Sequence, residues 1–411
     1  MTAWRTTLAA AALAASVVPV WAAPATADHD APCLVGEVPG SEPLADTHEE
    51  DNAAFDRMHV EQAQRVATGR GVKVAVIDSG VADGDGLDVY DGRAIPGVSA
   101  TTVLSGHGTI VGGLIAGPHG VAPDAQVFDV KVFDAEGADA TQGERLTSAG
   151  IAAGIDAVIA AHARERFDVV NISLAVGQPD PALEAAVARL VGLDVVVVAA
   201  AGNREVEEES DDSTFEGTPG NDADVYPADY PGVVAVSATP PDDGDPSAYV
   251  VPNMDTDVAA PTVGAISANA TGQVCVVEEV ATSWAAAEVS GILALLSERF
   301  PRETPQQLVA RLQATTEGAG APQGPDGEVE NPWTGAGVVQ AHDALTRQIE
   351  PGRKGRVETT VAETRAGAQA PPAPERLDLF STPRAILLWS GLVAGSLLAL
   401  AFMLRPLLRR P

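Results

Sequence analysis

Between about residue 59 and residue 346, short apolar runs alternate with longer, alanine-rich amphipathic stretches. The short runs are continuously apolar, which is typical of strands buried on both faces of a parallel sheet. Strands are expected at 72–77, 127–132, 169–174, 195–200 and 233–237, and helices at 109–116, 146–166, 181–190, 283–298 and 305–313. This alternation predicts an α/β fold, a three-layer sandwich in which helices cover both faces of a mostly parallel sheet. About 290 residues suit one large domain of this kind.

Two further apolar segments lie near the ends of the chain. Arg5 precedes an apolar stretch from Leu8 to about Ala23, and small residues follow it up to Ala27. This is the pattern of a secretory signal peptide, with an alanine-rich structural helix as the alternative. The second segment, Ala385–Leu404, has no charged residue and is long enough to cross a bilayer as a helix, with a buried core helix as the alternative. Arginines follow it, so the C-terminus is expected in the cytoplasm.

These patterns divide the chain into six expected parts. They are a signal peptide at 1–27, an extended N-terminal arm at 28–58, the α/β domain at 59–346, a Pro-rich linker at 347–383, a transmembrane helix at 384–404 and a cytoplasmic tail at 405–411. The linker lacks periodicity and suits a flexible stalk. The chain is therefore expected to span the cell membrane once, with its folded domain on the extracytoplasmic side.

The chain is strongly acidic, with 57 acidic residues against 25 basic ones and a formal net charge of −32. Binding to nucleic acid needs basic surface that neutralises phosphates, so no nucleic-acid partner is expected. Acidic residues are concentrated at 204–224, a segment with no apolar face. Their spacing does not match a calcium-binding loop, and a solvated loop is a better interpretation than a metal site.

The chain has two cysteines, Cys33 and Cys275. In an exported protein an even number of cysteines favours a disulfide, with two free thiols as the alternative. A Cys33–Cys275 bond would attach the N-terminal arm to the α/β domain.

Three short segments carry candidate catalytic residues in the order Asp, His, Ser. Asp78 follows the apolar run 72–77, His107 stands between two glycines, and Ser283 opens a small-residue stretch with helical character. A serine nucleophile needs a base to take its proton, and the base needs a carboxylate to orient it. Taken singly, the three residues have commoner roles as a turn residue, a surface histidine and a helix N-cap. Together they predict a catalytic triad.

Asn203 is a fourth candidate because it follows the apolar run 195–200 directly. A side-chain amide at the carboxyl edge of a sheet can donate a hydrogen bond to a tetrahedral oxyanion. A turn residue after Gly202 is the alternative interpretation.

These segments resemble the motifs of the subtilase family of serine proteases. The matching stretches are Val-Ile-Asp-Ser-Gly at 76–80, Gly-His-Gly-Thr at 106–109, Ala-Ala-Gly-Asn at 200–203 and Ala-Thr-Ser-Trp-Ala-Ala-Ala at 281–287. The resemblance implies a subtilisin-like sandwich and a serine endopeptidase that hydrolyses a protein or peptide substrate without a metal or cofactor. It also implies that Ser173, Leu174 and Ala175 border the substrate backbone.

The order of signal peptide, arm, protease domain, Pro-rich linker, single span and short basic tail is similar to that of mycosins. These are membrane-anchored subtilases of actinobacterial type VII secretion systems, so this resemblance implies association with a secretion membrane complex.

The chain departs from the family motifs at three alanines. Ala281 stands where the family has Gly, Ala287 where it has Pro, and Ala175 where it has Gly. A side chain at position 281 would strain the backbone if that position needed a positive φ. The alternative function is therefore a catalytically weak scaffold subunit that stabilises a secretion membrane complex.

Overall fold

The computed structural model describes residues 32–36, 52–82, 87–134, 143–204, 222–241, 244–317, 331–357 and 381–408. Their contacts form two units, Met1–Glu358 and Thr359–Pro411. The expected signal peptide at 1–27 and tail residues 409–411 lie outside the described residues.

A parallel sheet of seven strands organises the described part of the first unit, in the order β2-β3-β1-β4-β5-β6-β7. The strands are β1 (Lys73–Asp78), β2 (Val89–Ala94), β3 (Gln126–Lys131), β4 (Val169–Ile172), β5 (Val196–Ala200), β6 (Val233–Thr239) and β7 (Thr256–Pro261). β1, β4, β5 and β6 are almost completely buried, because continuous Val, Ile and Ala side chains fill both faces.

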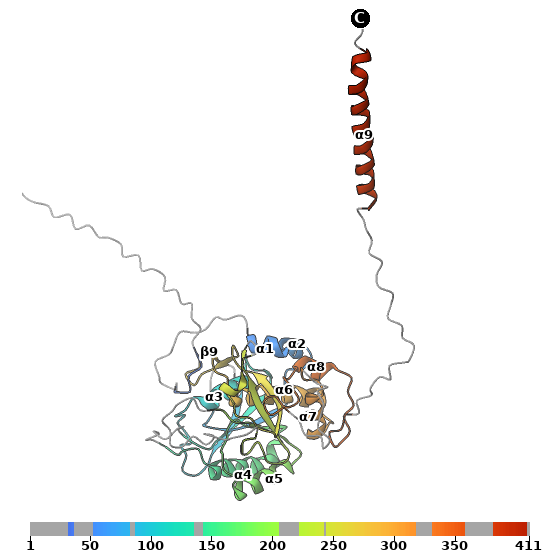
Figure 1. Cartoon of the computed structure of the whole chain (residues 1–411). Helices are drawn as coiled ribbons and strands as arrows, with labels where there is room; N and C mark the ends of the chain where they lie inside the picture. Colours follow the sequence, from blue (N-terminus) through green and yellow to red (C-terminus); the bar gives the residue numbers. More distant parts are fainter. Residues whose placement is uncertain are drawn as a thin grey trace, which may run out of the picture. The chain divides into compact units, whose positions relative to one another are not determined.

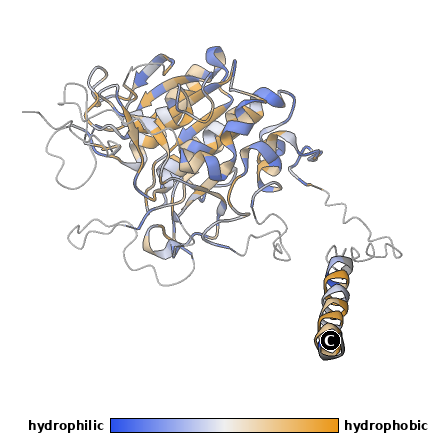
Figure 2. Cartoon of the chain, turned by 90° about the horizontal axis from the view of Figure 1, so that it is seen from above, coloured by the Kyte–Doolittle hydropathy of each residue, from blue (hydrophilic) through white to orange (hydrophobic). Residues whose placement is uncertain are grey.

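Helices cover both faces of this sheet and enclose two separate cores (Figure 1). The first core contains residues of α1 (Ala53–Met58), α2 (Val60–Gln64), α3 (His107–Ile115), α6 (Thr282–Arg299), α7 (Pro305–Gln313) and α8 (Ala341–Thr346). The second contains residues of α4 (Ser148–Glu165) and α5 (Pro181–Val191). The hydropathy colouring shows apolar strands between these two helical layers (Figure 2). The predicted α/β sandwich is therefore confirmed.

Most of the expected elements are present with shifts of one or two residues at their ends. β4 ends at Ile172, two residues earlier than expected. Two strands of the seven-stranded sheet were not expected, β2 and β7, and they lie at its two edges. Their sequences, Val-Tyr-Asp-Gly-Arg-Ala and Thr-Asp-Val-Ala-Ala-Pro, contain charged residues because an edge strand is paired on one side only.

The N-terminal arm differs from the expected extended segment. Residues 53–58 form α1, with Asn52 accepting a hydrogen bond from the Phe55 N–H at 3.0 Å. Ala54, Phe55 and Met58 are buried in the first core, because they lie on one face of the helix.

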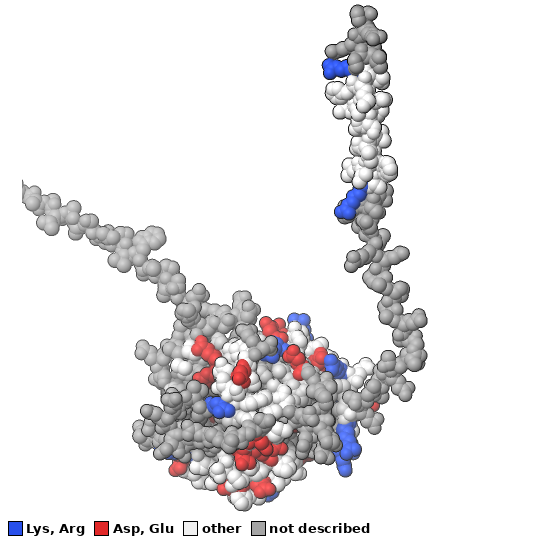
Figure 3. All heavy atoms as spheres, in the orientation of Figure 1, with Lys and Arg blue, Asp and Glu red and all other residues white. Residues whose placement is uncertain are grey.

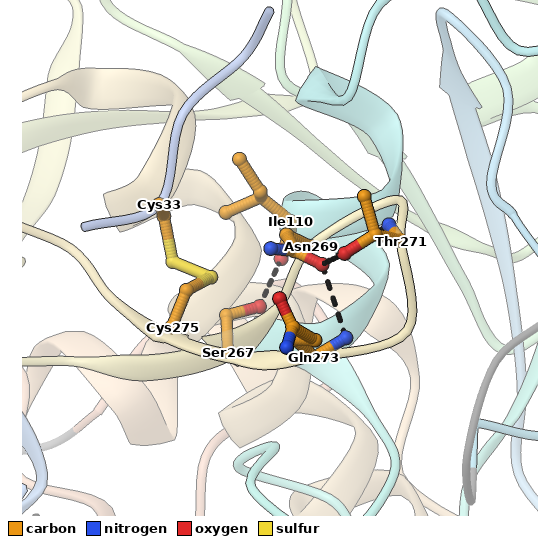
Figure 4. Close-up of a disulfide and its surroundings, with 7 residues drawn as sticks. All are labelled: Cys33, Ile110, Ser267, Asn269, Thr271, Gln273 and Cys275. Atoms are coloured by element: carbon orange, nitrogen blue, oxygen red, sulfur yellow. Dashed lines mark hydrogen bonds between the residues drawn. A yellow bond between two sulfur atoms is a disulfide. The ribbon is translucent and has the colours of Figure 1, made fainter. Parts of the chain in front are cut away.

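A small antiparallel pair, β8 (Ile266–Ala268) and β9 (Val274–Val276), packs beside α3. The structure joins Cys33 to Cys275 of β9 in a disulfide (Figure 4). The Cys33 N–H also donates to the Val276 carbonyl at 2.8 Å, and Pro32 forms a parallel bridge with Val276. Residues 32–36 are thus attached to the domain by one covalent bond and by backbone pairing.

The C-terminal end of the domain lies beyond residue 346, where the linker was expected to begin. The buried Arg311 guanidinium on α7 donates to the carbonyls of Arg347 and Ile349, at 3.3 and 2.8 Å. Gln307 donates to the Pro351 carbonyl at 2.7 Å. Residues up to 351 are therefore part of the packed domain.

The second unit contains α9 (Ser381–Leu408). Its segment Pro383–Arg405 is 23 residues long and is, by length and composition, apolar enough to cross a membrane. Its apolar side chains are exposed, and the helix is free of charge except near its two ends, where Arg384 and Arg405 lie (Figure 3). The length and composition of this helix are compatible with the expected membrane span.

Candidate active site

Asp78 is the last residue of β1 and is fully buried at the carboxyl end of the sheet. Its Oδ1 lies 2.8 Å from Nδ1 of His107, and it also accepts the Ser79 N–H at 2.7 Å. The carboxylate is thereby fixed in orientation against the imidazole ring. Such a contact holds a histidine in one tautomer and leaves Nε2 to exchange protons.

His107 is the first residue of α3, and close packing of glycines sets its distance from β1. A Cβ atom on Gly108 would lie 2.6 Å from the Gly80 carbonyl oxygen and 3.0 Å from Asp78 Oδ1. Gly80 itself has a φ of 101°, a conformation that favours glycine. Glycine at positions 80 and 108 therefore allows α3 to approach the end of β1.

Ser283 is the second residue of α6, and only 6% of its surface is exposed. The next residue, Trp284, stacks beside His107 with ring centroids 4.7 Å apart and an interplanar angle of 32°. The Ser173 hydroxyl donates to the Ser283 carbonyl at 2.7 Å. The start of α6 is thus held against α3 on one side and against the end of β4 on the other.

The backbone at Ala281 is extended, with φ −142° and ψ 139°. Any residue adopts this conformation, so the strain that was considered for an alanine at this position does not arise. Ala287 is buried within α6 and continues the helix without interruption.

Asn203 lies just beyond β5, and Thr282 fixes its side chain. Asn203 Oδ1 accepts hydrogen bonds from the Thr282 N–H at 2.7 Å and from the Thr282 hydroxyl at 3.0 Å. With the oxygen engaged twice, the amide nitrogen is the group that can donate elsewhere. The contact also places the amide beside the residue that precedes Ser283.

Residues 173–175 leave the sheet after β4. The hydroxyl of Ser173 is engaged with Ser283, and Leu174 is buried in the second core, whereas Ala175 is half-buried. The side chains of Ser173 and Leu174 are thus used within the protein, and the backbone is the part of this segment that remains for a ligand.

Three contacts of the site had no signal in the sequence. Val35, next to the disulfide, accepts a hydrogen bond from the Gly106 N–H at 2.6 Å, at the start of α3. Trp284 contacts His107 as described above. The third is the proximity of Asp129 on β3 to Asp78. Asp129 pairs with Val76 of β1, and Asp78 lies two residues after Val76, so the two carboxylates lie on the same face of the sheet.

Burial is the main cause of two raised pKa values around the site. It raises the pKa of Asp129 to about 7; the Asp78 charge adds to this rise, and a hydrogen bond from the Val81 N–H and the charge of Lys131 oppose it. Burial also raises the pKa of Glu288 on α6 well above its usual range. Neither Glu288 carboxyl oxygen has a hydrogen-bond partner among the described residues.

The described residues contain no group of three or more His, Cys, Asp or Glu side chains that could hold a metal ion. Most of the acidic segment 204–224 lies outside the described residues.

Residues 69–337 match the description "Subtilase family". The chain belongs to the subtilase family. Subtilases are serine proteases, so the expected family, the subtilisin-like fold and the enzyme class are confirmed.

Mycosin-1 of Mycobacterium tuberculosis is 32% identical to this subtilase over 333 residues, which cover 71% of this chain and 72% of mycosin-1. Minor extracellular protease Epr of Bacillus subtilis is 33% identical over 267 residues, which cover 62% of this chain but 36% of Epr. This subtilase therefore spans about a third of that relative's length.

Among solved structures, MycP1 from the ESX-1 type VII secretion system matches with a TM-score of 0.58 and 28% identity. The match covers 79% of this chain and 92% of the MycP1 chain. The expected similarity to mycosins is therefore confirmed.

Proposed function

We propose that this subtilase is a membrane-anchored endopeptidase that hydrolyses peptide bonds of proteins or peptides outside the cytoplasm. The observation that carries the proposal is the 2.8 Å contact between Asp78 and His107, made where Trp284 brings the start of α6 against the same imidazole. Family membership supports this assignment.

In the proposed mechanism, the Ser283 hydroxyl attacks the peptide carbonyl while His107 takes its proton. His107 then protonates the leaving amine, and Asp78 stabilises the imidazolium throughout. The oxyanion receives hydrogen bonds from the Asn203 amide and from the Ser283 N–H. Water then hydrolyses the acyl-enzyme, again with His107 as the base.

The substrate is proposed to lie along the backbone of residues 173–175. This segment passes the Ser283 carbonyl, which Ser173 holds at 2.7 Å. An extended peptide beside an extended segment forms main-chain hydrogen bonds that do not depend on its sequence.

We also propose that the chain is anchored by a transmembrane helix at 384–404 and carries a removable signal peptide at 1–27. The exposed apolar surface of α9 supports the anchor. The similarity to MycP1 of a type VII secretion system supports association with such a membrane complex. In cells that lack this gene, secretion restored by Ser283→Ala protein would assign the chain a scaffold role in addition to proteolysis.

The function is tested by labelling the full-length protein with a fluorophosphonate probe, which reacts with activated serines. Wild-type protein is expected to be labelled and to cleave peptides, whereas Ser283→Ala is expected to do neither, with a loss on the order of 10⁶ in turnover. Ser297→Ala, on the same helix, is the control, because the Ser297 hydroxyl donates to the Leu293 carbonyl within α6. Undiminished peptidase activity of Ser283→Ala protein would overturn the assignment.

A further inference from the structure

Trp284 is a large aromatic side chain placed against the base of the proposed triad. It is 3% exposed, and His107 is 7% exposed, so the two rings meet in a nearly water-free environment. Their centroid distance of 4.7 Å and angle of 32° place the imidazole over the aromatic system, nearer to stacked than to edge-on.

This geometry has an electrostatic consequence when the imidazole is charged. An aromatic face carries negative charge density and attracts a cation within about 6 Å of the ring centroid, most strongly for Trp and in a desolvated site. In triad catalysis His107 becomes an imidazolium only as the serine attacks, so an attraction to the imidazolium is stronger in the transition state than in the ground state.

We propose that Trp284 is a positioning residue that stabilises the imidazolium form of His107 during peptide hydrolysis, an inference that rests on the proposed function. Asp78 also stabilises the imidazolium, through its contact with Nδ1 of His107. Trp284 thus adds a second source of stabilisation, on the ring face and not in the ring plane.

The other charged groups on the described elements around His107 are few. Asp129 and Lys131 lie on β3, next to β1, and Glu288 lies one helical turn after Trp284. Burial raises the pKa of Glu288 well above its usual range and so favours the neutral acid. The described residues of α3 and of segment 32–36 contain no other group that titrates, because Cys33 is in a disulfide.

The experiment compares full-length wild-type protein with Trp284→Phe and Trp284→Leu. Trp284→Leu is expected to lower kcat about 3- to 30-fold with little change in KM, while Trp284→Phe, which keeps an aromatic face, retains most of the activity. The acidic limb of the pH profile of kcat/KM is expected to move to lower pH in Trp284→Leu, because the imidazolium loses a favourable contact. Trp333→Leu, a half-buried tryptophan of the same core, is the matched control and should leave the profile in place.

A second measurement does not depend on peptidase activity. With histidine labelled at its ring nitrogens, NMR follows the titration midpoint of His107, assigned by comparison with a His107→Gln variant. The midpoint is expected to fall by about 0.5–1 pH unit in Trp284→Leu and to be restored in large part in Trp284→Phe.

The outcomes separate two failures. An unchanged or higher midpoint in folded Trp284→Leu protein would overturn the inference, because Trp284 would then act as an apolar wall that only excludes water. Peptidase activity retained by Ser283→Ala would instead overturn the proposed function, and the NMR midpoint would still report on the Trp284 contact.

Discussion

Asn203 and Thr282 are linked by two hydrogen bonds to a single atom, since Asn203 Oδ1 accepts both the backbone N–H and the hydroxyl of Thr282. The residue that precedes the proposed nucleophile thus sets the orientation of the proposed oxyanion donor. The two proposed oxyanion donors, the Asn203 amide and the Ser283 N–H, are therefore held in a fixed relation to each other, where β5 ends and α6 begins.

Replacing Asn203 by Ala is expected to lower kcat about 10²- to 10³-fold with little change in KM, the size of effect known for the corresponding donor in subtilisin. Steady-state kinetics of purified protein measure it. Thr282→Val removes one of the two orienting hydrogen bonds and should give a smaller loss. A rise in KM alone for Asn203→Ala would mean that the amide only shapes the binding site.

Glu288→Gln is expected to remove a pH-dependent loss of stability. Because burial raises the pKa of Glu288 in the folded protein, the folded state binds this proton more tightly than the unfolded state. Stability therefore falls as pH rises from the ordinary value of 4.5 toward the raised pKa. Between pH 5 and pH 8 wild type should therefore lose stability that the variant retains.

Urea unfolding between pH 5 and pH 8 measures this effect of Glu288. The exposed residue Glu350 provides the control variant, Glu350→Gln, whose stability should follow the wild-type pH dependence. An identical pH slope in Glu288→Gln and wild type would show that Glu288 ionises freely in the folded protein.

The double variant Cys33→Ser/Cys275→Ser is expected to lose about 2–5 kcal/mol of unfolding free energy, because the disulfide closes a loop with a sequence separation of 242 residues. Residues 32–36 should also be held less firmly, which weakens the Val35–Gly106 hydrogen bond next to His107. Denaturation with and without reductant measures the loss: reductant should destabilise wild type and leave the double variant unchanged. Equal stability of all four samples would contradict a structural role.

A chain that ends after Val357 is expected to be released into the medium as a soluble, folded protein, since it lacks α9 and retains the contacts of α7 with residues 347–353. A chain that ends after Thr346 is the informative comparison. It loses the carbonyls that accept from Arg311, and leaving a buried charged group without these partners should make it markedly less stable. Thermal unfolding of the two products checks the difference, and similar melting temperatures would place the domain end at residue 346.

The sequence was sufficient to predict the elements whose signal is local, and it singled out the candidate triad for the same reason. β1, β5 and β6 have continuous apolar runs, and Asp78, His107 and Ser283 each lie in a short motif with a defined backbone setting. The edge strands β2 and β7 were missed because half-exposed strands carry charged residues, which weaken the apolar pattern.

Contacts between distant parts of the chain could not be predicted in this way. The Val35 carbonyl that meets Gly106 belongs to the backbone, which has no sequence signature. Trp284 reads as an ordinary buried aromatic residue until the fold places His107 against it. The conformation of Ala281 also required the structure, because the family motif alone suggested strain where the backbone is extended.

Hydrogen bonds from α7 hold residues 347–351 against the domain, and this attachment has a mechanical consequence. Tension applied to the C-terminal end of the domain reaches first the Arg353 carbonyl held by Thr304, then the carbonyls held by Gln307 and Arg311. These contacts are made by α7 and by the residue before it, whereas Ser283 lies in the first turn of α6. A pull on the C-terminal end of the domain would thus load α7 and the residue before it ahead of α6.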